Sequence, residues 1–183
     1  MWNSYLRWRH SKGYGVHSPY AYRFVNDVVR PGNYGYYAYG EAERLAMKWG
    51  VHTASPFKLI KFLIRLAVFL KSSRILIYGR KCEEAKIAAN ALNLPVRIIK
   101  GGLGKDVKPQ DLVIIEGEEP DEKEIRDVLS KQAPVMAINP SKKIREILLK
   151  PLDKGVLFIG KTKILLIPRR EMSYVSYLLR FPC

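Results

Sequence analysis

From residue 74 onward, short apolar runs alternate with charged segments along the chain. The runs are rich in β-branched residues and leucine, and Gly or Pro bounds most of them. Short continuous apolar runs are typical of strands that are buried on both faces of a sheet. The six runs are Arg74–Gly79, Val96–Gly101, Asp111–Gly117, Pro134–Asn139, Gly155–Gly160 and Lys163–Pro168.

Two of the segments between these runs have the pattern of helices. Glu83–Leu94 follows the first run, and Asp121–Lys131 follows the third, with Pro120 directly before it. Proline is tolerated at a helix start, because the N–H that it lacks has no partner there. Strands that alternate with helices predict an α/β fold with a mostly parallel sheet.

The last part of the chain departs from this alternation. Only Lys161 and Thr162 separate the fifth run from the sixth, whereas a parallel crossover needs about a dozen residues or more. We therefore expect the sheet to end in an antiparallel hairpin. Ser173–Phe181 fits either one more strand or a short helix, because its periodicity is compatible with both.

The first part of the chain has the pattern of a helical extension that is rich in tyrosine. Tyr20–Val29 and Glu41–Trp49 are candidate helices, and Pro56–Lys71 is a third, with Ser55 as its expected N-cap. We therefore divide the chain into a helical extension, residues 1–55, and an α/β domain, residues 56–183.

The third candidate helix carries Lys58, Lys61 and Arg65 on one face. Its remaining apolar residues are then expected to cover the sheet. They are Phe57, Ile60, Leu63, Ile64, Ala67 and Val68. This stretch is shorter than the roughly 20 apolar residues that span a bilayer, and no transmembrane segment is expected.

Composition narrows the class of protein. The 183 residues are 48% hydrophobic and 27% charged, as in an ordinary globular protein, which excludes general disorder. Two cysteines are too few for a disulfide scaffold. The chain start lacks the apolar core of a signal peptide, so we expect a reduced, cytoplasmic setting.

The charge is strongly basic, with 32 Lys and Arg against 17 Asp and Glu and a formal net charge of +15. Three interpretations stay open. The excess binds nucleic acid or another polyanion, it meets an anionic membrane surface through the Lys58, Lys61 and Arg65 face, or it only solvates a small domain. An aromatic and basic arm near the start suits the first of these: Trp2, Arg7, Trp8, Arg9, His10 and Lys12.

One segment resembles a known family. Gly13–Val29 reads GYGVHSPYAYRFVNDVV and precedes the ordered runs RILIYG, DLVIIEG and GVLFIG. This arrangement resembles bacterial class I S-adenosylmethionine-dependent methyltransferase-like proteins, often described as O-methyltransferases, in which a G(I/V)HSPF segment precedes a Rossmann-like domain. The resemblance implies a Rossmann-like, methyltransferase-type, mostly parallel sheet.

The resemblance also implies a place for the cofactor S-adenosylmethionine, at the carboxyl ends of the first strands. Tyr78, Gly79, Gly101 and Glu116 are its cofactor-binding positions in this sequence. His17 and Tyr20 would contact the substrate or form a lid over the pocket. His17 has an alternative role, since Ser18 and Pro19 after it favour a helix start, which the imidazole would cap or anchor.

The sequence departs from the family pattern at the positions that hold the cofactor. Ile77 stands where the first strand carries an acid, and Lys100 stands where the second strand ends in an acid that accepts from the ribose. We therefore expect binding of S-adenosylmethionine to be weak or lost. The segment from Gly101 to Asp111 is also too short for a strand and helix, so we expect a sheet shortened by about one β-α unit.

A metal site is not expected, because the strand that follows Glu116 ends in Asn139 rather than in carboxylates. The acidic cluster that begins with Glu116 suits a solvated helix N-terminus better than a metal centre or acid/base work. Its members are Glu116, Glu118, Glu119, Asp121, Glu122, Glu124 and Asp127. Cys82 is either a reactive thiol near a helix start or a structural cysteine.

A loop with Tyr34, Tyr36, Tyr37 and Tyr39 either stacks on bases or packs on the neighbouring domain.

Two functions remain in view. One is a methyltransferase-like protein for an unidentified small molecule, with weakened or lost cofactor binding. The other is a non-catalytic basic module that binds nucleic acid or another polyanion. The sequence leaves the oligomeric state open.

Overall fold

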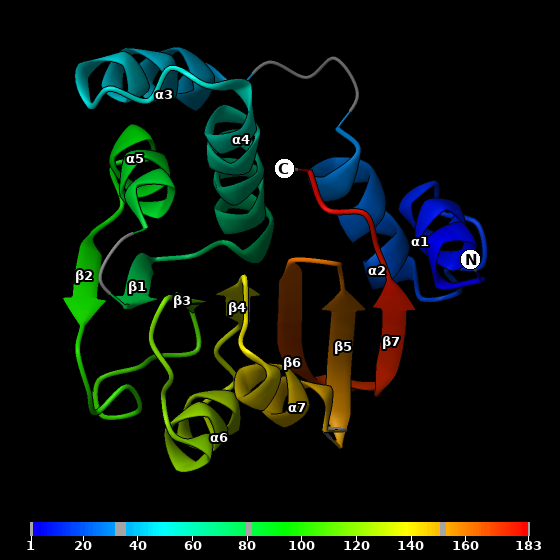
Figure 1. Cartoon of the computed structure of the whole chain (residues 1–183). Helices are drawn as coiled ribbons and strands as arrows, with labels where there is room; N and C mark the ends of the chain where they lie inside the picture. Colours follow the sequence, from blue (N-terminus) through cyan, green and yellow to red (C-terminus); the bar gives the residue numbers. More distant parts are fainter. Residues whose placement is uncertain (1, 32–35, 80–81, 151–152, 183) are drawn as a thin grey trace.

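The computed structural model describes residues 2–31, 36–79, 82–150 and 153–182 and arranges them in three layers, with helices on both faces of one sheet (Figure 1). The helices are α1 (Trp2–Ser11), α2 (Pro19–Phe24), the π-helical turn η1 (Val25–Val29), α3 (Tyr37–Lys48), α4 (Ala54–Leu70), α5 (Glu83–Ala91), α6 (Glu122–Ser130) and α7 (Lys142–Leu149). The strands are β1 (Arg74–Tyr78), β2 (Val96–Ile99), β3 (Asp111–Glu116), β4 (Val135–Ile138), β5 (Lys154–Ile159), β6 (Lys163–Ser173) and β7 (Val175–Leu178).

The seven strands form one mixed sheet in the order β2-β1-β3-β4-β6-β5-β7. The strands from β2 to β4 are parallel, and β6 runs antiparallel to both β4 and β5. The expected α/β class and the antiparallel β5–β6 hairpin are thereby confirmed. The undecided segment after Ser173 forms a strand, β7, which pairs with β5 in parallel.

The apolar runs form strands because both faces of the central sheet are covered. In β1, Ile75 and Ile77 pack into a core with α2, η1, α4 and α5, whereas Leu76 and Tyr78 pack into a second core with α6 and α7. The expectation of two buried faces is wrong for β2. Among the described strands it pairs with β1 alone, and its residues Arg97 and Ile98 are exposed.

The sequence pattern did not indicate α1 or α7. Helix α7 begins after Ser141, whose Oγ accepts a hydrogen bond from the backbone N–H of Ile144 at 3.3 Å. Its buried residues Ile144, Ile147 and Leu148 face the second core. The signal was therefore present as an N-cap serine followed by apolar residues at helical spacing.

Helix α4 is buried around most of its circumference, which corrects the expected division of its faces. Leu59 and Phe62 are buried along with Ile60, Leu63, Ile64 and Ala67, whereas Phe57 is half-buried and Val68 is 44% exposed. Arg65 is only 6% exposed. Its Nε donates to the carbonyl of Val28 at 2.8 Å, and its guanidinium also donates to the Tyr39 hydroxyl at 2.9 Å.

The basic face of α4 therefore packs against η1 and α3. Lys61 pairs with Glu43 of α3 at 3.1 Å, and its ammonium lies over the rings of Phe57 and Tyr39. Arg65 and Lys61 are thus engaged within the protein, whereas Lys58 is exposed. These three residues do not form one free basic face toward a membrane surface. No described helix has the length and apolar character needed to cross a bilayer.

The N-terminal helices and the sheet share one hydrophobic core, to which α2, η1, α3 and α4 all contribute. Helix α1 lies beside β7 (Figure 1). The hydroxyl of Ser11 accepts from the backbone N–H of Arg180 at 2.7 Å, and Nδ1 of His10 accepts from that of Leu178 at 3.2 Å. Residues near both ends of the chain thus hold each other in place.

Replacing Arg65 tests the role of its buried guanidinium. Arg65→Met keeps a long side chain but removes the donors to Val28 and Tyr39. We expect the free energy of unfolding to fall by about 1–3 kcal/mol, measured by urea denaturation. Lys58→Met, at an exposed position of the same helix, should change it by less than about 0.5 kcal/mol. Equal effects of the two substitutions would contradict this role.

Candidate functional site

The carboxyl ends of β1 and β3 meet at the point where the strand order reverses. The chain runs from β1 to β2 on one side and then returns to β3 on the other side of β1. In open α/β sheets, ligands bind in the crevice at such a switch point. Gly79 directly follows β1, and Glu116 is the last residue of β3, so the structure brings these two predicted site residues together.

Gly79 packs directly against the backbone of Glu116. Its φ is +129°, a conformation that favours glycine. A Cβ atom at this position would lie 1.8 Å from the carbonyl oxygen of Glu116. The backbone of β3 therefore occupies the space next to Gly79 into which a side chain would project.

Tyr78 does not face the crevice. Its ring packs into the core that contains α6 and α7, and its hydroxyl forms a hydrogen bond with Glu124. Burial, together with nearby acids, raises the pKa of Tyr78. Tyr78 thus connects β1 to the start of α6 instead of presenting its hydroxyl to a ligand.

The acidic segment after Glu116 builds the start of α6. Asp121 and Glu124 form a capping box, and Glu124 also accepts from the backbone N–H of Leu103 at 3.0 Å. Burial opposes ionisation of Glu124, but these hydrogen bonds lower its pKa overall. Glu122 pairs with Arg126 and Lys150. These acids perform the helix-start role that the sequence indicated.

Two other residues that were expected near the cofactor, Lys100 and Gly101, follow the outer strand β2. Gly101 comes two residues after β2 and is exposed, with open space around the position of a Cβ atom. Lys100 is also exposed. The next two residues after Gly79, Arg80 and Lys81, lie outside the described residues.

A small pocket lies between the ends of β3 and β4. Its volume is about 170 Å³, and its lining includes Gly117, Asn139 and Ser141. Pockets that hold cofactor-sized ligands usually measure about 300–1,000 Å³. This pocket is too small for such a ligand.

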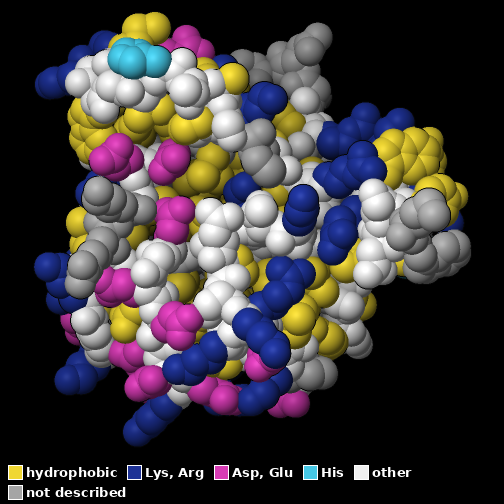
Figure 2. Space-filling view, in the orientation of Figure 1, with side chains coloured by type: hydrophobic (Ala, Val, Ile, Leu, Met, Phe, Trp, Pro, Cys, Tyr) yellow, Lys and Arg dark blue, Asp and Glu magenta, His cyan; other side chains and the backbone are white. Residues whose placement is uncertain are grey.

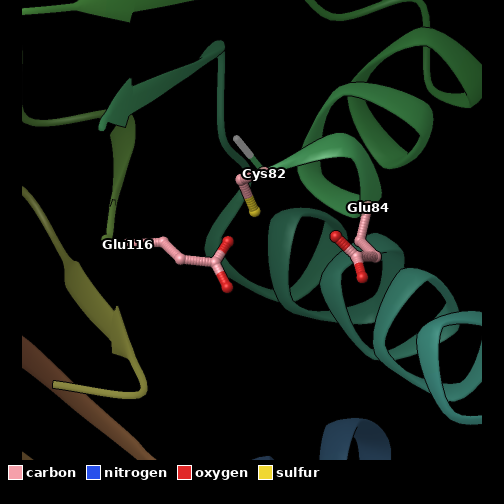
Figure 3. A group of neighbouring side chains, drawn as sticks. All are labelled: Cys82, Glu84 and Glu116. Carbon is pink, nitrogen blue, oxygen red and sulfur yellow. The ribbon is translucent and has the colours of Figure 1, made fainter. Parts of the chain in front are cut away.

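Three side chains of types that can ligate a metal lie near Gly79, in an arrangement that the sequence did not indicate. Cys82 and Glu84 come from the start of α5, and Glu116 comes from β3; the three side chains point toward a common space (Figure 3). One donor atom of each lies within 4.8 Å of the others. The sequence analysis compared Glu116 only with the end of β4, whereas its partners lie in the segment that follows β1.

The electrostatics of this cluster are unusual. Burial raises the pKa of the Cys82 thiol strongly, and the neighbouring Glu116 adds to this effect. Burial also raises the pKa of Glu116; Glu84 adds to this shift, whereas the hydrogen bond with Cys82 and the charge of Lys163 oppose it. Lys163 is itself 4% exposed. A fully buried thiol with a raised pKa is not a nucleophile at neutral pH, which argues against the reactive-thiol interpretation of Cys82.

A basic groove lies at the amino ends of β1, β3 and β4, opposite the carboxyl ends where Gly79 and Glu116 lie. Two adjoining cavities of about 630 Å³ and 400 Å³ share Gln132, Pro168 and Arg170. Six basic and two acidic side chains line them. The basic ones are Arg23, Lys71, Arg126, Lys154, Arg169 and Arg170, and the acids are Asp153 and Glu171.

Tyr20 lies in this basic groove, with the Arg169 guanidinium 4.4 Å from its ring centroid. The structure therefore does not bring Tyr20 together with Gly79. His17 is exposed and precedes Ser18, whose Oγ accepts from the backbone N–H of Ala21 at 3.3 Å. Ser18 also donates its own N–H to the Tyr177 hydroxyl, so this segment begins α2 and joins it to β7.

The expected aromatic and basic arm forms helix α1. Tyr5 and Trp8 stack with ring centroids 6.1 Å apart and are 49% and 39% exposed, and the Lys12 ammonium lies 4.6 Å from the Trp8 ring. His10 is turned inward, against Tyr177. Of the tyrosine loop, Tyr39 accepts from Arg65, Tyr36 packs beside Tyr39, and Tyr37 is exposed, whereas Tyr34 lies outside the described residues.

Compared with known proteins, the chain matches no family model and no curated protein.

Substituting Gly79 tests its contact with Glu116. Gly79→Ala places a methyl group against the Glu116 carbonyl and strains a positive φ, so we expect the free energy of unfolding to fall by about 2–4 kcal/mol. Gly40→Ala provides the control, because Gly40 lies within α3 with open space around it. That change should stabilise the protein by about 0.5–1 kcal/mol. A neutral Gly79→Ala in urea denaturation would contradict the close approach.

Proposed function

We propose that this chain is a Rossmann-like, methyltransferase-type protein that has lost its cofactor site and binds single-stranded nucleic acid through the basic groove. The observation that carries the proposal is the groove itself, in which basic side chains from separate segments of the chain converge.

The strand order supports the methyltransferase-type part of the proposal. A doubly wound Rossmann sheet has the order 3-2-1-4-5-6. Here β2, β1, β3 and β4 follow one another in the sheet, and β2 is its edge. This corresponds to the doubly wound order without its outer strand, as expected from the short segment between Gly101 and Asp111. The GVHSP segment before the sheet adds to this likeness.

The residues at the switch point do not fit S-adenosylmethionine. The space beside Gly79 is filled by the Glu116 carbonyl, and Tyr78 is engaged with Glu124. Ile77, which stands where the family has an acid, is buried in the core. Lys100 offers a donor where the ribose hydroxyls need an acceptor. We therefore assign no methyl-transfer step to this site.

The basic groove suits a chain of phosphates. Lys71, Lys154 and Arg170 are exposed and have no ion-pair partner among the described residues. Arg169 and Arg126 pair with surface acids, and such exposed pairs are weak enough to exchange for phosphate. Positive side chains along a groove are the usual way in which proteins follow a nucleic-acid backbone.

Basic and acidic side chains are separated on the face shown in Figure 2. Lys and Arg side chains form a band from the right of the view toward its lower centre, whereas most Asp and Glu lie further left. The net charge of +15 is thus unevenly displayed on this face.

Exposed aromatic rings favour a single strand over other polyanions. Tyr5 and Trp8 present partly exposed rings on α1, between basic residues. The turn after α1 contacts α2, since Gly13 lies against the ring of Tyr22, and α2 supplies Tyr20 and Arg23 to the groove. The unpaired bases of a single strand can stack on aromatic rings. A duplex or a polyphosphate offers no unpaired base for such stacking.

Binding of a fluorescent single-stranded oligonucleotide, followed by anisotropy, tests the groove. Lys154→Glu with Arg170→Glu should weaken binding at least about tenfold and reduce the slope of log K against log salt, which is roughly −0.7 for each phosphate contact on single strands. Lys48→Glu with Lys58→Glu gives the same charge change on the exposed surfaces of α3 and α4 and should have a smaller effect. Equal effects, or binding that does not respond to salt, would overturn the groove assignment.

Calorimetry with S-adenosylmethionine and S-adenosylhomocysteine tests the loss of the cofactor site. We expect no binding heat at micromolar concentrations, because the chain's own backbone and side chains occupy the expected contacts. Micromolar binding of either compound would contradict the proposed loss and restore the methyltransferase function.

A further inference from the structure

The cluster of Cys82, Glu84 and Glu116 lies apart from the basic groove, near the carboxyl ends of β1 and β3. Cys82 precedes α5, Glu84 lies in the first turn of that helix, and Glu116 ends β3. Their donor atoms lie within 4.8 Å of one another. Donors that share one tetrahedral Zn²⁺, with bonds of about 2.0–2.3 Å, lie roughly 3.3–3.5 Å apart. Rotations of the two carboxylate side chains can bring the donor atoms to these shorter distances.

The cluster has unsatisfied polar capacity. Oε2 of Glu116 is completely buried and has no hydrogen-bond partner among the described residues. Cys82 is also completely buried. A buried carboxylate oxygen without a partner costs free energy. The Glu116 carboxylate to which it belongs faces a second carboxylate and a thiol (Figure 3). A cation in the common space would give this oxygen a partner and would bind all three groups.

We propose that Cys82, Glu84 and Glu116 bind a divalent transition-metal ion, with Zn²⁺ as the ion that suits them best. A thiolate favours zinc over the hard cations Mg²⁺ and Ca²⁺, which take oxygen ligands. Three protein ligands leave the fourth position of a tetrahedral zinc site for water or a ligand. This inference does not depend on nucleic-acid binding.

Binding would change the protonation of the site. The thiol of Cys82 must lose its proton to become a ligand, so zinc binding releases a proton to solvent. The ion replaces that proton as the positive partner of the cluster. Lys163, which is buried and interacts electrostatically with Glu116, compensates part of the negative charge of the two carboxylates and the thiolate.

Titration of the full chain with Co²⁺, followed by displacement with Zn²⁺, tests the site. The chain has two cysteines, and Cys183→Ser leaves Cys82 as its only thiol. We expect one Co²⁺ per chain and a thiolate-to-cobalt charge-transfer band in the near ultraviolet, which Zn²⁺ abolishes. The melting temperature should rise with Zn²⁺.

Variants in the same Cys183→Ser background identify the ligands. Glu84→Gln and Glu116→Gln should each weaken binding at least about tenfold, and Cys82→Ser should remove the charge-transfer band. Glu83→Gln is the matched control, because Glu83 lies beside Glu84 in α5 but is exposed and outside the cluster; it should bind as the parent does. If Cys82→Ser disturbs folding, the comparison of Glu84→Gln with Glu83→Gln still decides. Absence of the band in the parent, equal binding by these two glutamine variants, or metal binding retained by a folded Cys82→Ser would overturn the proposal.

Discussion

The approach of Gly79 to the carbonyl oxygen of Glu116 determines the arrangement of the carboxyl edge. It requires a glycine, because any side chain at residue 79 would meet the backbone of β3. It joins the end of β1 to the end of β3 at the switch point of the sheet. Two consequences follow from this one contact. The crevice where a nucleotide-like cofactor would lie is narrowed, and the start of α5 comes close enough to β3 for Cys82 to reach Glu116.

The central strands explain why polar chemistry is confined to the two edges of the sheet. β1, β3 and β4 are buried on both faces by helices, so their side chains serve the two hydrophobic cores. Polar groups can gather only where these strands begin and end. Acids and a thiol gather at the carboxyl edge, whereas arginines and lysines gather at the amino edge. The two proposed sites therefore lie at opposite ends of the central strands, with the length of these strands between them.

Much of the fold could be predicted from the sequence because its signals are local. Apolar runs bounded by Gly or Pro indicated β1, β3, β4, β5 and β6. The two-residue connection between β5 and β6 indicated that these two strands form a hairpin. The pairing of β7 with β5 could not be predicted, because it depends on long-range contacts with α1. The burial of Arg65 was also missed, since its partners Val28 and Tyr39 belong to other helices. A basic residue at helical spacing looks the same whether water or a backbone carbonyl surrounds it.

The candidate sites were predictable only in part, for the same reason. Gly79 and Glu116 could be placed at strand ends from the sequence alone. The partnership of Glu116 with Cys82 and Glu84 depends on how closely one loop approaches one strand, which no local pattern records. The basic groove combines residues from segments as far apart as Arg23 and Arg170, so its charge appeared in the sequence only as a general excess.

The hydrogen bonds between α1 and the segment after β7 set an order on folding during synthesis. Ser11 and His10 find their partners at Arg180 and Leu178, which leave the ribosome last among the described elements. Until then α1 has no strand to dock on, and the outer side of β5 is an unpaired strand edge that can pair with another chain. Pairing of β7 with β5 covers this edge and immobilises α1 in the same step, so the unfinished chain is most prone to aggregation before residues 175–180 can pair.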